Sequence, residues 1–210
     1  MKKQSEKTAQ TQADLVEAFW KLYKEKPINK ITVKEITDTA GYYRSTFYYY
    51  FEDVYAILEY IENSVMQEWE SCISKAFQDE QICLLQYDMH LLIDYITPFY
   101  IQNGEYISVL LSPKGDPLFN QRIKETVHSK LFTVLDIPFN IPEAELFFEC
   151  IISGMLALFV KWYNDKLPLN LVMNVVHQII IDRNVLTILL SYSSNPLIQQ
   201  LAFHHGGDSN

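Results

Sequence analysis

An aromatic run between a glycine and an acidic pair constrains the fold of this chain more than any other feature. Residues 41–51 read GYYRSTFYYYF, and seven of these eleven residues are aromatic. Taken alone, the run favours a β-strand, because Thr, Tyr and Phe fit a pleated, half-buried surface. A strand needs a partner strand, and no other convincing strand occurs in the sequence. We therefore expect the run to be helical.

The residues before the run predict a short helix that ends at Gly41. In ITVKEITDTAG, Thr32 is followed three residues later by Glu35, which is the spacing of a capping box at a helix N-terminus. Ile36 and Ala40 then share one face, with Val33 beside them. Because glycine tolerates a left-handed backbone at little cost, Gly41 is a suitable end for this helix.

A second short helix is expected from Arg44 to Tyr50, after a turn of only two residues. On this helix Phe47 shares one side with Tyr50 and Phe51, while Tyr48 and Tyr49 face away together with Ser45. A short helix, a tight turn containing glycine and another short helix form the helix-turn-helix arrangement. Half of the aromatic residues are therefore expected in the core, and half are expected to face DNA.

The remaining periodicity predicts an all-α protein with about nine helices. A first amphipathic helix covers residues 11–26, and a long helix with Asp53 as its N-cap covers 53–77. The last two helices are apolar on almost every side, which indicates burial against a second copy of the chain. Helices of the larger part are expected at 81–97, 104–111, 117–135, 143–163 and 168–190.

Charge is divided unevenly along the chain. Residues 1–50 carry nine Lys/Arg and six Asp/Glu, a net charge of +3, whereas residues 51–210 carry eight and twenty, a net charge of −12. Such asymmetry suggests a small basic module attached to an acidic body. We predict two domains: a three-helix head at 1–52 and a larger helical body at 53–210.

Several classes of protein are disfavoured by what the sequence lacks. Its three cysteines have no paired spacing, and His90, His128 and His177 lie on different predicted helices, so no metal site is expected. No Gly-rich phosphate loop, H-E-x-x-H or G-x-S-x-G is present, which argues against an enzyme or a bound cofactor. A polar N-terminus and the lack of a long uncharged apolar run predict a cytoplasmic protein that does not enter a membrane.

The segment ITVKEITDTAGYYRSTFYYYFEDVYAIL, residues 31–58, resembles the DNA-binding domain of TetR/AcrR-type bacterial transcriptional regulators. The later segment VLLSPKGDPLF resembles the C-terminal region of a Gram-positive branch of that family. The resemblance implies an all-α homodimer in which two helix-turn-helix heads read a palindromic operator. It also implies that the last two helices of each protomer form the dimer interface.

The resemblance further implies which residues of the head contact DNA. Arg44, Ser45 and Thr46 would read bases or adjacent phosphates in the major groove. Tyr49 would pack on a thymine methyl group. Tyr50 is open between a phosphate contact and a partly buried core position. The residues expected at the DNA are Thr32, Lys34, Arg44, Ser45, Thr46, Tyr48, Tyr49 and Tyr50.

This sequence departs from the family pattern at two positions. Tyr43 stands where a capping Ser is usual, which suggests that the recognition helix begins later, with Ser45 as its cap. Val54 stands where a phosphate-binding Lys is common, so DNA binding is expected to depend less steeply on salt. The N-terminal lysines either compensate by contacting DNA or, as we favour, form a disordered tail; they are Lys2, Lys3 and Lys7.

In the family, an effector that binds the body moves the two heads and releases the operator. The expected function is therefore that of a repressor released by an unknown effector. The alternative is a co-regulator whose body binds a partner protein. A pocket of several hundred Å³ would favour a small molecule, and an exposed apolar patch on a solid core would favour a protein. Candidate pocket residues, each also compatible with simple core, are Tyr87, Phe99, Phe119, Phe148 and Trp162.

Overall fold

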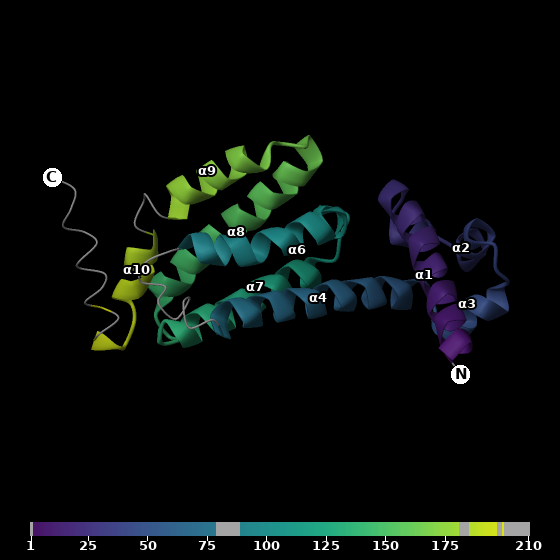
Figure 1. The fold of residues 1–210 in the computed structure, drawn as a ribbon, viewed down its shortest axis with the longest axis horizontal. Helices are drawn as coiled ribbons and strands as arrows, with labels where there is room; N and C mark the ends of the chain where they lie inside the picture. The colour runs from purple at the N-terminus through teal and green to yellow at the C-terminus, as the bar shows by residue number, and fades with distance from the viewer. Residues whose placement is uncertain (1, 79–88, 181–184, 197–198, 200–210) are drawn as a thin grey trace. The chain divides into compact units, whose positions relative to one another are not determined.

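The computed structural model of this chain is built of helices throughout the part it describes, which is residues 2–78, 89–180, 185–196 and 199 (Figure 1). Within those residues there are nine α-helices, a short 3-10 helix and no strand, so the all-α prediction is confirmed. The chain divides into two compact units, Met1–Val65 and Met66–Asn210, and the boundary falls within helix α4 (Val54–Gln78).

The first unit holds α1 (Lys2–Glu25), the 3-10 helix η1 (Ile28–Lys30), α2 (Val33–Ala40), α3 (Arg44–Tyr50) and the start of α4. Helix α1 packs against α2, and α2 packs against α3. Apolar side chains from all four α-helices are buried in one small core, among them Leu15, Phe19, Ile36, Phe47, Phe51, Ile57 and Ile61. Burial of this core from several helices is what allows α2 and α3 to be so short.

Local signals in the sequence set the ends of these helices as predicted. The capping box at the start of α2 is present, and Gly41 ends α2 with φ +76° and ψ 30°. Helix α3 has the predicted bounds. At the start of α4, Oδ1 of Asp53 accepts hydrogen bonds of 2.8 Å from the backbone N–H groups of Tyr55 and Ala56. These ends depend on contacts within a few residues, which explains why the sequence alone reveals them.

The N-terminus differs from the prediction, because α1 begins at Lys2 rather than near Thr11. The expectation of a disordered tail for the N-terminal lysines is therefore wrong. Residues 2–10 contain no Gly or Pro and are rich in Lys, Gln, Glu and Ala, which favour helix without requiring an apolar stripe. The hydroxyl of Thr11 donates to the carbonyl of Lys7 at 3.0 Å, across one helical turn.

The second unit holds the end of α4 together with α6 (Met89–Leu110), α7 (Pro117–Val134), α8 (Pro142–Asp165), α9 (Leu169–Ile180) and α10 (Val185–Ser191). Helix α8 packs against α6, α9 and α10. Proline occupies the first turn of both α7 and α8, where its missing N–H is not needed. The rings of Tyr100 and Phe159 stack at 3.8 Å and join α6 to α8.

One prediction that the structure overturns is the break near Pro98. The sequence predicted two helices, 81–97 and 104–111, whereas a single helix runs through Pro98 from Met89 to Leu110. Residues 79–88 lie outside the described part of the chain. Pro98 cannot make one backbone hydrogen bond of the helix. Packing holds the helix directly after it, where the rings of Phe99 and Tyr100 lie 5.0 and 6.1 Å from the Trp69 ring.

The predicted helix 168–190 is also wrong as a single element. Helix α9 ends at Ile180 and α10 begins at Val185, with residues 181–184 outside the described part. Helix α10 packs against α9, which one straight helix would not allow. Beyond α10, Ser194 donates its N–H to the carbonyl of Asp136 at 2.7 Å, so the residues after α10 pack on the turn that follows α7.

The left-handed backbone at Gly41 predicts a specific sensitivity to substitution. Gly41→Ala should lower the free energy of unfolding by about 1 kcal/mol, because a Cβ is disfavoured at positive φ. A Cβ at this position meets no atom within 4 Å, so the loss would come from the backbone rather than from a clash. Denaturant unfolding measures it. Gly41→Asn should lose less, since Asn tolerates this conformation; equal losses would contradict the explanation.

Candidate nucleic-acid interface

Helix α3 separates its aromatic side chains into a buried and an exposed set. The rings of Phe47 and Phe51 are buried in the first unit and lie 5.8 Å apart. Tyr48 and Tyr49 point outward, with 59% and 77% of their surface exposed. Tyr50 is half-buried, and its ring meets that of Tyr49 edge-on at 4.9 Å. The outward face of α3 therefore presents tyrosine rings and hydroxyls.

The N-terminal end of α3 is also open, because Arg44 and Ser45 are exposed and Thr46 is half-buried. Tyr43 is the N-cap residue, and its side chain makes no capping hydrogen bond. The suggestion that the helix begins later, with Ser45 as its cap, is therefore wrong. The carbonyl of Tyr43 accepts from the N–H groups of Thr46 and Phe47 at 2.9 and 3.3 Å, so backbone bonds alone start the helix.

The turn between α2 and α3 is tied to α1 by side chains that are far apart in sequence. The hydroxyl of Tyr42 donates to Oδ2 of Asp14 at 2.7 Å, and the amide of Gln10 donates to Oδ1 at 2.8 Å. These two hydrogen bonds, with Tyr42 the larger cause, lower the pKa of Asp14. The Tyr42 hydrogen bond fixes the position of the turn on the long α1 helix, and the sequence analysis missed it.

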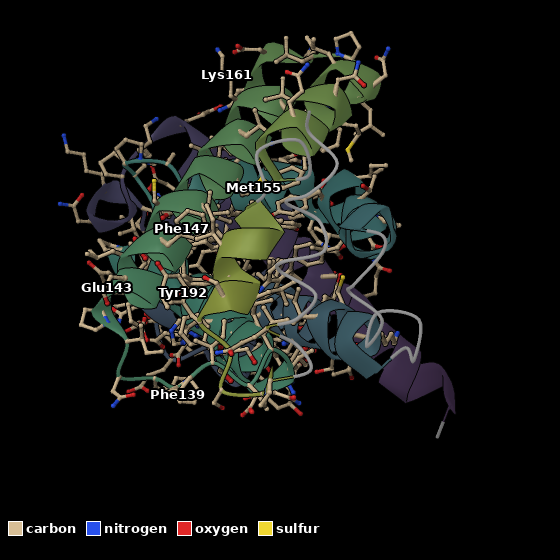
Figure 2. All side chains as sticks on the ribbon, turned by 90° about the vertical axis from the view of Figure 1, so that its left-hand side faces the viewer. Phe139, Glu143, Phe147, Met155, Lys161 and Tyr192 are labelled. Atoms are coloured by element: carbon tan, nitrogen blue, oxygen red, sulfur yellow. The ribbon has the colours of Figure 1, made fainter. Side chains whose placement is uncertain are left out.

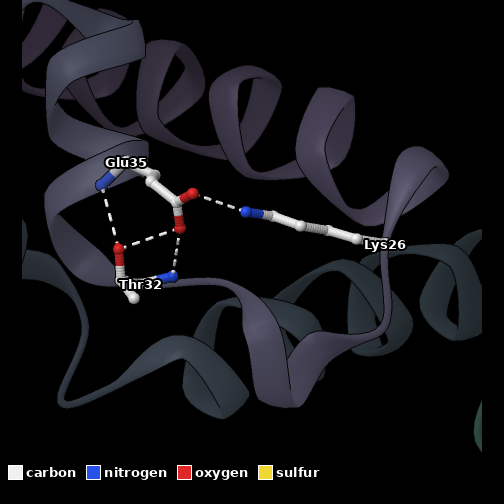
Figure 3. Close-up of polar contacts among 3 residues, drawn as sticks. All are labelled: Lys26, Thr32 and Glu35. Atoms are coloured by element: carbon white, nitrogen blue, oxygen red, sulfur yellow. Dashed lines mark hydrogen bonds and ion pairs between the residues drawn. The ribbon is translucent and has the colours of Figure 1, made fainter.

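Thr32 at the start of α2 is already engaged in a local network (Figure 3). Its N–H and its hydroxyl both donate to Oε2 of Glu35, at 3.0 and 2.9 Å. The ammonium of Lys26 donates to Oε1 of the same carboxylate at 2.5 Å. The Lys26 contact first, and the Thr32 hydrogen bonds next, lower the pKa of Glu35 to about 2. The Thr32 hydroxyl therefore has its proton occupied, while Lys34 is exposed beside it.

The first turn of α4 lies next to this surface in sequence and adds a residue that the sequence analysis missed. Val54 is buried, so the position where the family often has lysine contributes to the core here. Tyr55 follows it and is 57% exposed, and Tyr43 before α3 is 83% exposed. Tyr43 was noted in the sequence only as an unusual cap, and Tyr55 was not noted, because the exposure of both rings is seen only once the helices are placed.

The candidate effector residues of the second unit do not share one pocket. Phe99 lines a groove of about 400 Å³ between α4 and α6, whereas Phe148 lines one of about 430 Å³ between α7 and α8. Phe119 is fully buried, and Trp162 donates its ring N–H to the carbonyl of Leu167 at 2.9 Å. Tyr87 lies outside the described residues. The effector site stays a prediction.

Histidine and acidic residues of the second unit form pairs rather than metal sites. Nε2 of His128 lies 2.8 Å from Oε2 of Glu145, and the imidazole stacks on Phe132 at 4.0 Å. Within the residues that the structure describes, no three His, Cys, Asp or Glu side chains converge as a metal site would require. None of the helices in the described residues is apolar over a stretch long enough to cross a membrane.

Comparison with known proteins agrees with this geometry. Residues 15–61 match the model of a family described as bacterial regulatory proteins, tetR family. A solved structure with a similar fold is a tetR-family transcriptional regulator from Streptomyces coelicolor, with a TM-score of 0.60 and 16% sequence identity over 96% of this chain and 90% of that one. No curated protein sequence matches the chain.

The matched segment contains α2, α3 and the C-terminal part of α1, together with the start of α4. The match over residues 15–61 supports the predicted classification with the TetR family. The similar structure shows the same fold. The family match supports a DNA-binding transcriptional regulator.

The low pKa of Glu35 predicts acid sensitivity. A carboxylate whose pKa falls from 4.5 to about 2 on folding stabilises the native state above pH 4.5 and loses that contribution as the pH falls towards 2. Glu35→Gln should therefore flatten the pH dependence of unfolding in this window. Lys26→Met, which keeps the capping box, should flatten it in part. An unchanged pH profile in Glu35→Gln would contradict the account.

Proposed function

We propose that this chain is a transcriptional repressor that binds a palindromic operator as a homodimer and is released by an effector. The observation that carries the proposal is the outward face of α3, where Tyr48 and Tyr49 are exposed while Phe47 anchors the helix. The outward side chains of a short helix after a tight turn suit the major groove, where each base pair presents a distinct set of donors and acceptors.

The proposed contacts divide into those that read bases and those that position the head. Arg44, Ser45 and Tyr49 would meet base edges or thymine methyl groups. Tyr48, Tyr50 and Lys34 would donate to phosphate oxygens, which fixes register without reading sequence. Thr32 would act through the positive N-terminal end of α2 rather than by its hydroxyl proton, which Glu35 holds. Thr46 is the last of the proposed DNA contacts and would meet a base or an adjacent phosphate.

We propose that the two parts of the chain have different functions. Residues 1–52 would form the DNA-binding head, and residues 53–210 the body that dimerises and binds the effector. Two heads on one side of the duplex need half-sites about 34–36 Å apart, so an effector that changes their separation would weaken binding. Grooves of about 400 to 440 Å³ in the second unit fall in the range of small-molecule sites.

A co-regulator whose body binds a partner protein is the second candidate. It is favoured by large apolar side chains that stay exposed on the second unit, such as Phe139 and Leu118, at 60% and 63% of their surface. A partner protein that binds the isolated chain without DNA, together with no effector that releases DNA, would favour this candidate.

The first experiment is a titration of the protein against DNA from upstream of its own coding region, with scrambled DNA as control, at two salt concentrations. Specific binding that weakens with salt supports the proposal. Because the family lysine is replaced by buried Val54, we expect a shallow salt dependence. If the upstream DNA binds no better than scrambled DNA, the operator does not lie in that DNA and must be sought elsewhere.

Tyrosine variants of α3 separate the two kinds of contact. Tyr48→Phe removes one hydroxyl donor to a charged phosphate and should weaken binding to every sequence about tenfold, or roughly 1.5 kcal/mol. Tyr49→Ala should instead reduce the preference for operator over scrambled DNA. Tyr163→Phe, which removes a hydroxyl from the second unit, is the matched control. Binding by both α3 variants at the wild-type level would overturn the assignment of α3.

A further inference from the structure

A groove of about 440 Å³ runs between α7 and the second half of α8, a size in the range of small-molecule sites. Figure 2 shows the course of α8 from Glu143 to Lys161, and the groove follows this helix from Ser153 onward. Both apolar and polar side chains line it. The polar ones are Asn120, Lys124, Ser153, Lys161, Asn164 and Asp165.

Asn120 brings a buried acceptor to this groove. Its Oδ1 is buried and accepts no hydrogen bond from the residues that the structure describes. A buried polar group without a partner is costly, and most buried polar groups in proteins have one. Because an amide oxygen only accepts hydrogen bonds, the group that satisfies it must donate an N–H or an O–H. This acceptor therefore suits a ligand that carries a donor.

Lys124 lies one helical turn after Asn120 and brings a cation to the same groove. An ammonium group has three donors. Two of them reach Oε1 of Glu149 and Oγ of Ser153, the latter at 2.8 Å, and the described residues offer no third partner. The hydrogen bond from Lys124 is the main cause that lowers the pKa of Glu149, so this carboxylate stays charged and holds the ammonium in place. One donor of Lys124 thus remains for a ligand.

The charges and the apolar surface of the groove narrow the class of ligand. Lys124, Lys161 and Asp165 give its lining a net charge of +1, which suits a singly charged anion. Lys161 has a side chain that is 67% exposed and pairs with Asp165 on the surface, whereas the side chain of Lys124 is only 20% exposed. Lys124 is therefore the cation that water screens less. Leu156 and Val160 add apolar surface beside it.

We propose that this groove binds a small organic acid with one carboxylate, a hydroxyl or N–H donor next to it, and an apolar chain. The carboxylate accepts from Nζ of Lys124, the donor reaches Oδ1 of Asn120, and the chain lies against Leu156 and Val160. Side chains four positions apart on a helix lie about 5–6 Å apart, so the donor and the carboxylate are close neighbours in the ligand, as in an α-hydroxy acid. A role of this acid as the effector rests on the proposed function, whereas its binding does not.

Calorimetric titration of the full chain without DNA tests the ligand class with three matched probes. They are leucic acid, isocaproic acid, which lacks the hydroxyl donor, and the methyl ester of leucic acid, which lacks the charge. Leucic acid should bind at least about fivefold more tightly than either of the others, because each of them loses a hydrogen bond to a partly buried group. Lactic and phenyllactic acid extend the test to a shorter and a wider chain. Equal binding of the matched probes, or no binding by any hydroxy acid, would overturn the proposal.

Two substitutions assign each preference to one residue. Lys124→Met removes the cation and should abolish the preference for leucic acid over its methyl ester, while the preference over isocaproic acid persists. Asn120→Leu removes the acceptor and should do the reverse. This crossed pattern is a double-mutant cycle between protein and ligand. Asn170→Leu, the same change at an exposed asparagine of α9, is the matched control and should leave both preferences unchanged.

Thermal unfolding of the chain without ligand separates a ligand contact from a structural one. Asn120→Leu replaces a buried acceptor that has no partner among the described residues by an apolar side chain of similar size. The variant should therefore keep or raise the Tm while it binds leucic acid more weakly. A lower Tm together with an intact preference for leucic acid over isocaproic acid would show a structural role and overturn the assignment of Asn120.

Addition of leucic acid to the complex with DNA distinguishes this proposal from the proposed function. If the acid binds with both preferences and specific DNA binding is unchanged, the ligand site stands and release of DNA through it fails. If no hydroxy acid binds while the chain still binds DNA specifically, the ligand site is overturned and DNA reading stands.

Discussion

Burial of the Phe47 ring decides how every other side chain of α3 is directed. The ring has no exposed surface. It contacts the ring of Tyr48 in a T-shaped arrangement and the ring of Phe51 in a tilted one. Since successive helical positions turn by a fixed angle, fixing Phe47 inward leaves Tyr48 and Tyr49 outward. A strand would have alternated the same residues between two faces. The choice of helix over strand thus determines which tyrosines can meet another molecule.

A seven-residue helix is too short to persist alone, so its surroundings must hold it. The Lys26–Glu35–Thr32 network ties the end of α1 to the start of α2, and the Tyr42–Asp14 bond ties the turn to the middle of α1. Through these contacts the long first helix acts as the scaffold on which α3 is placed. These polar contacts therefore serve to position α3.

The sequence was informative where a feature depends on near neighbours. The Thr32 cap, the Gly41 turn, the Asp53 cap and the outward tyrosines all follow from spacings of a few residues. It was misleading at Pro98, where rings from α4 and α8 hold a helix that proline alone would break. The Tyr42–Asp14 bond joins residues 28 positions apart, and no local rule identifies it.

In the proposed function, the first unit reads DNA through α3 on a two-fold symmetric body. Selection of binding sites from a random DNA pool by the full-length protein tests this most directly. The account predicts enrichment of an inverted repeat whose half-sites lie about one helical turn apart. A folded protein that enriches no sequence, or enriches a site without two-fold symmetry, would contradict it.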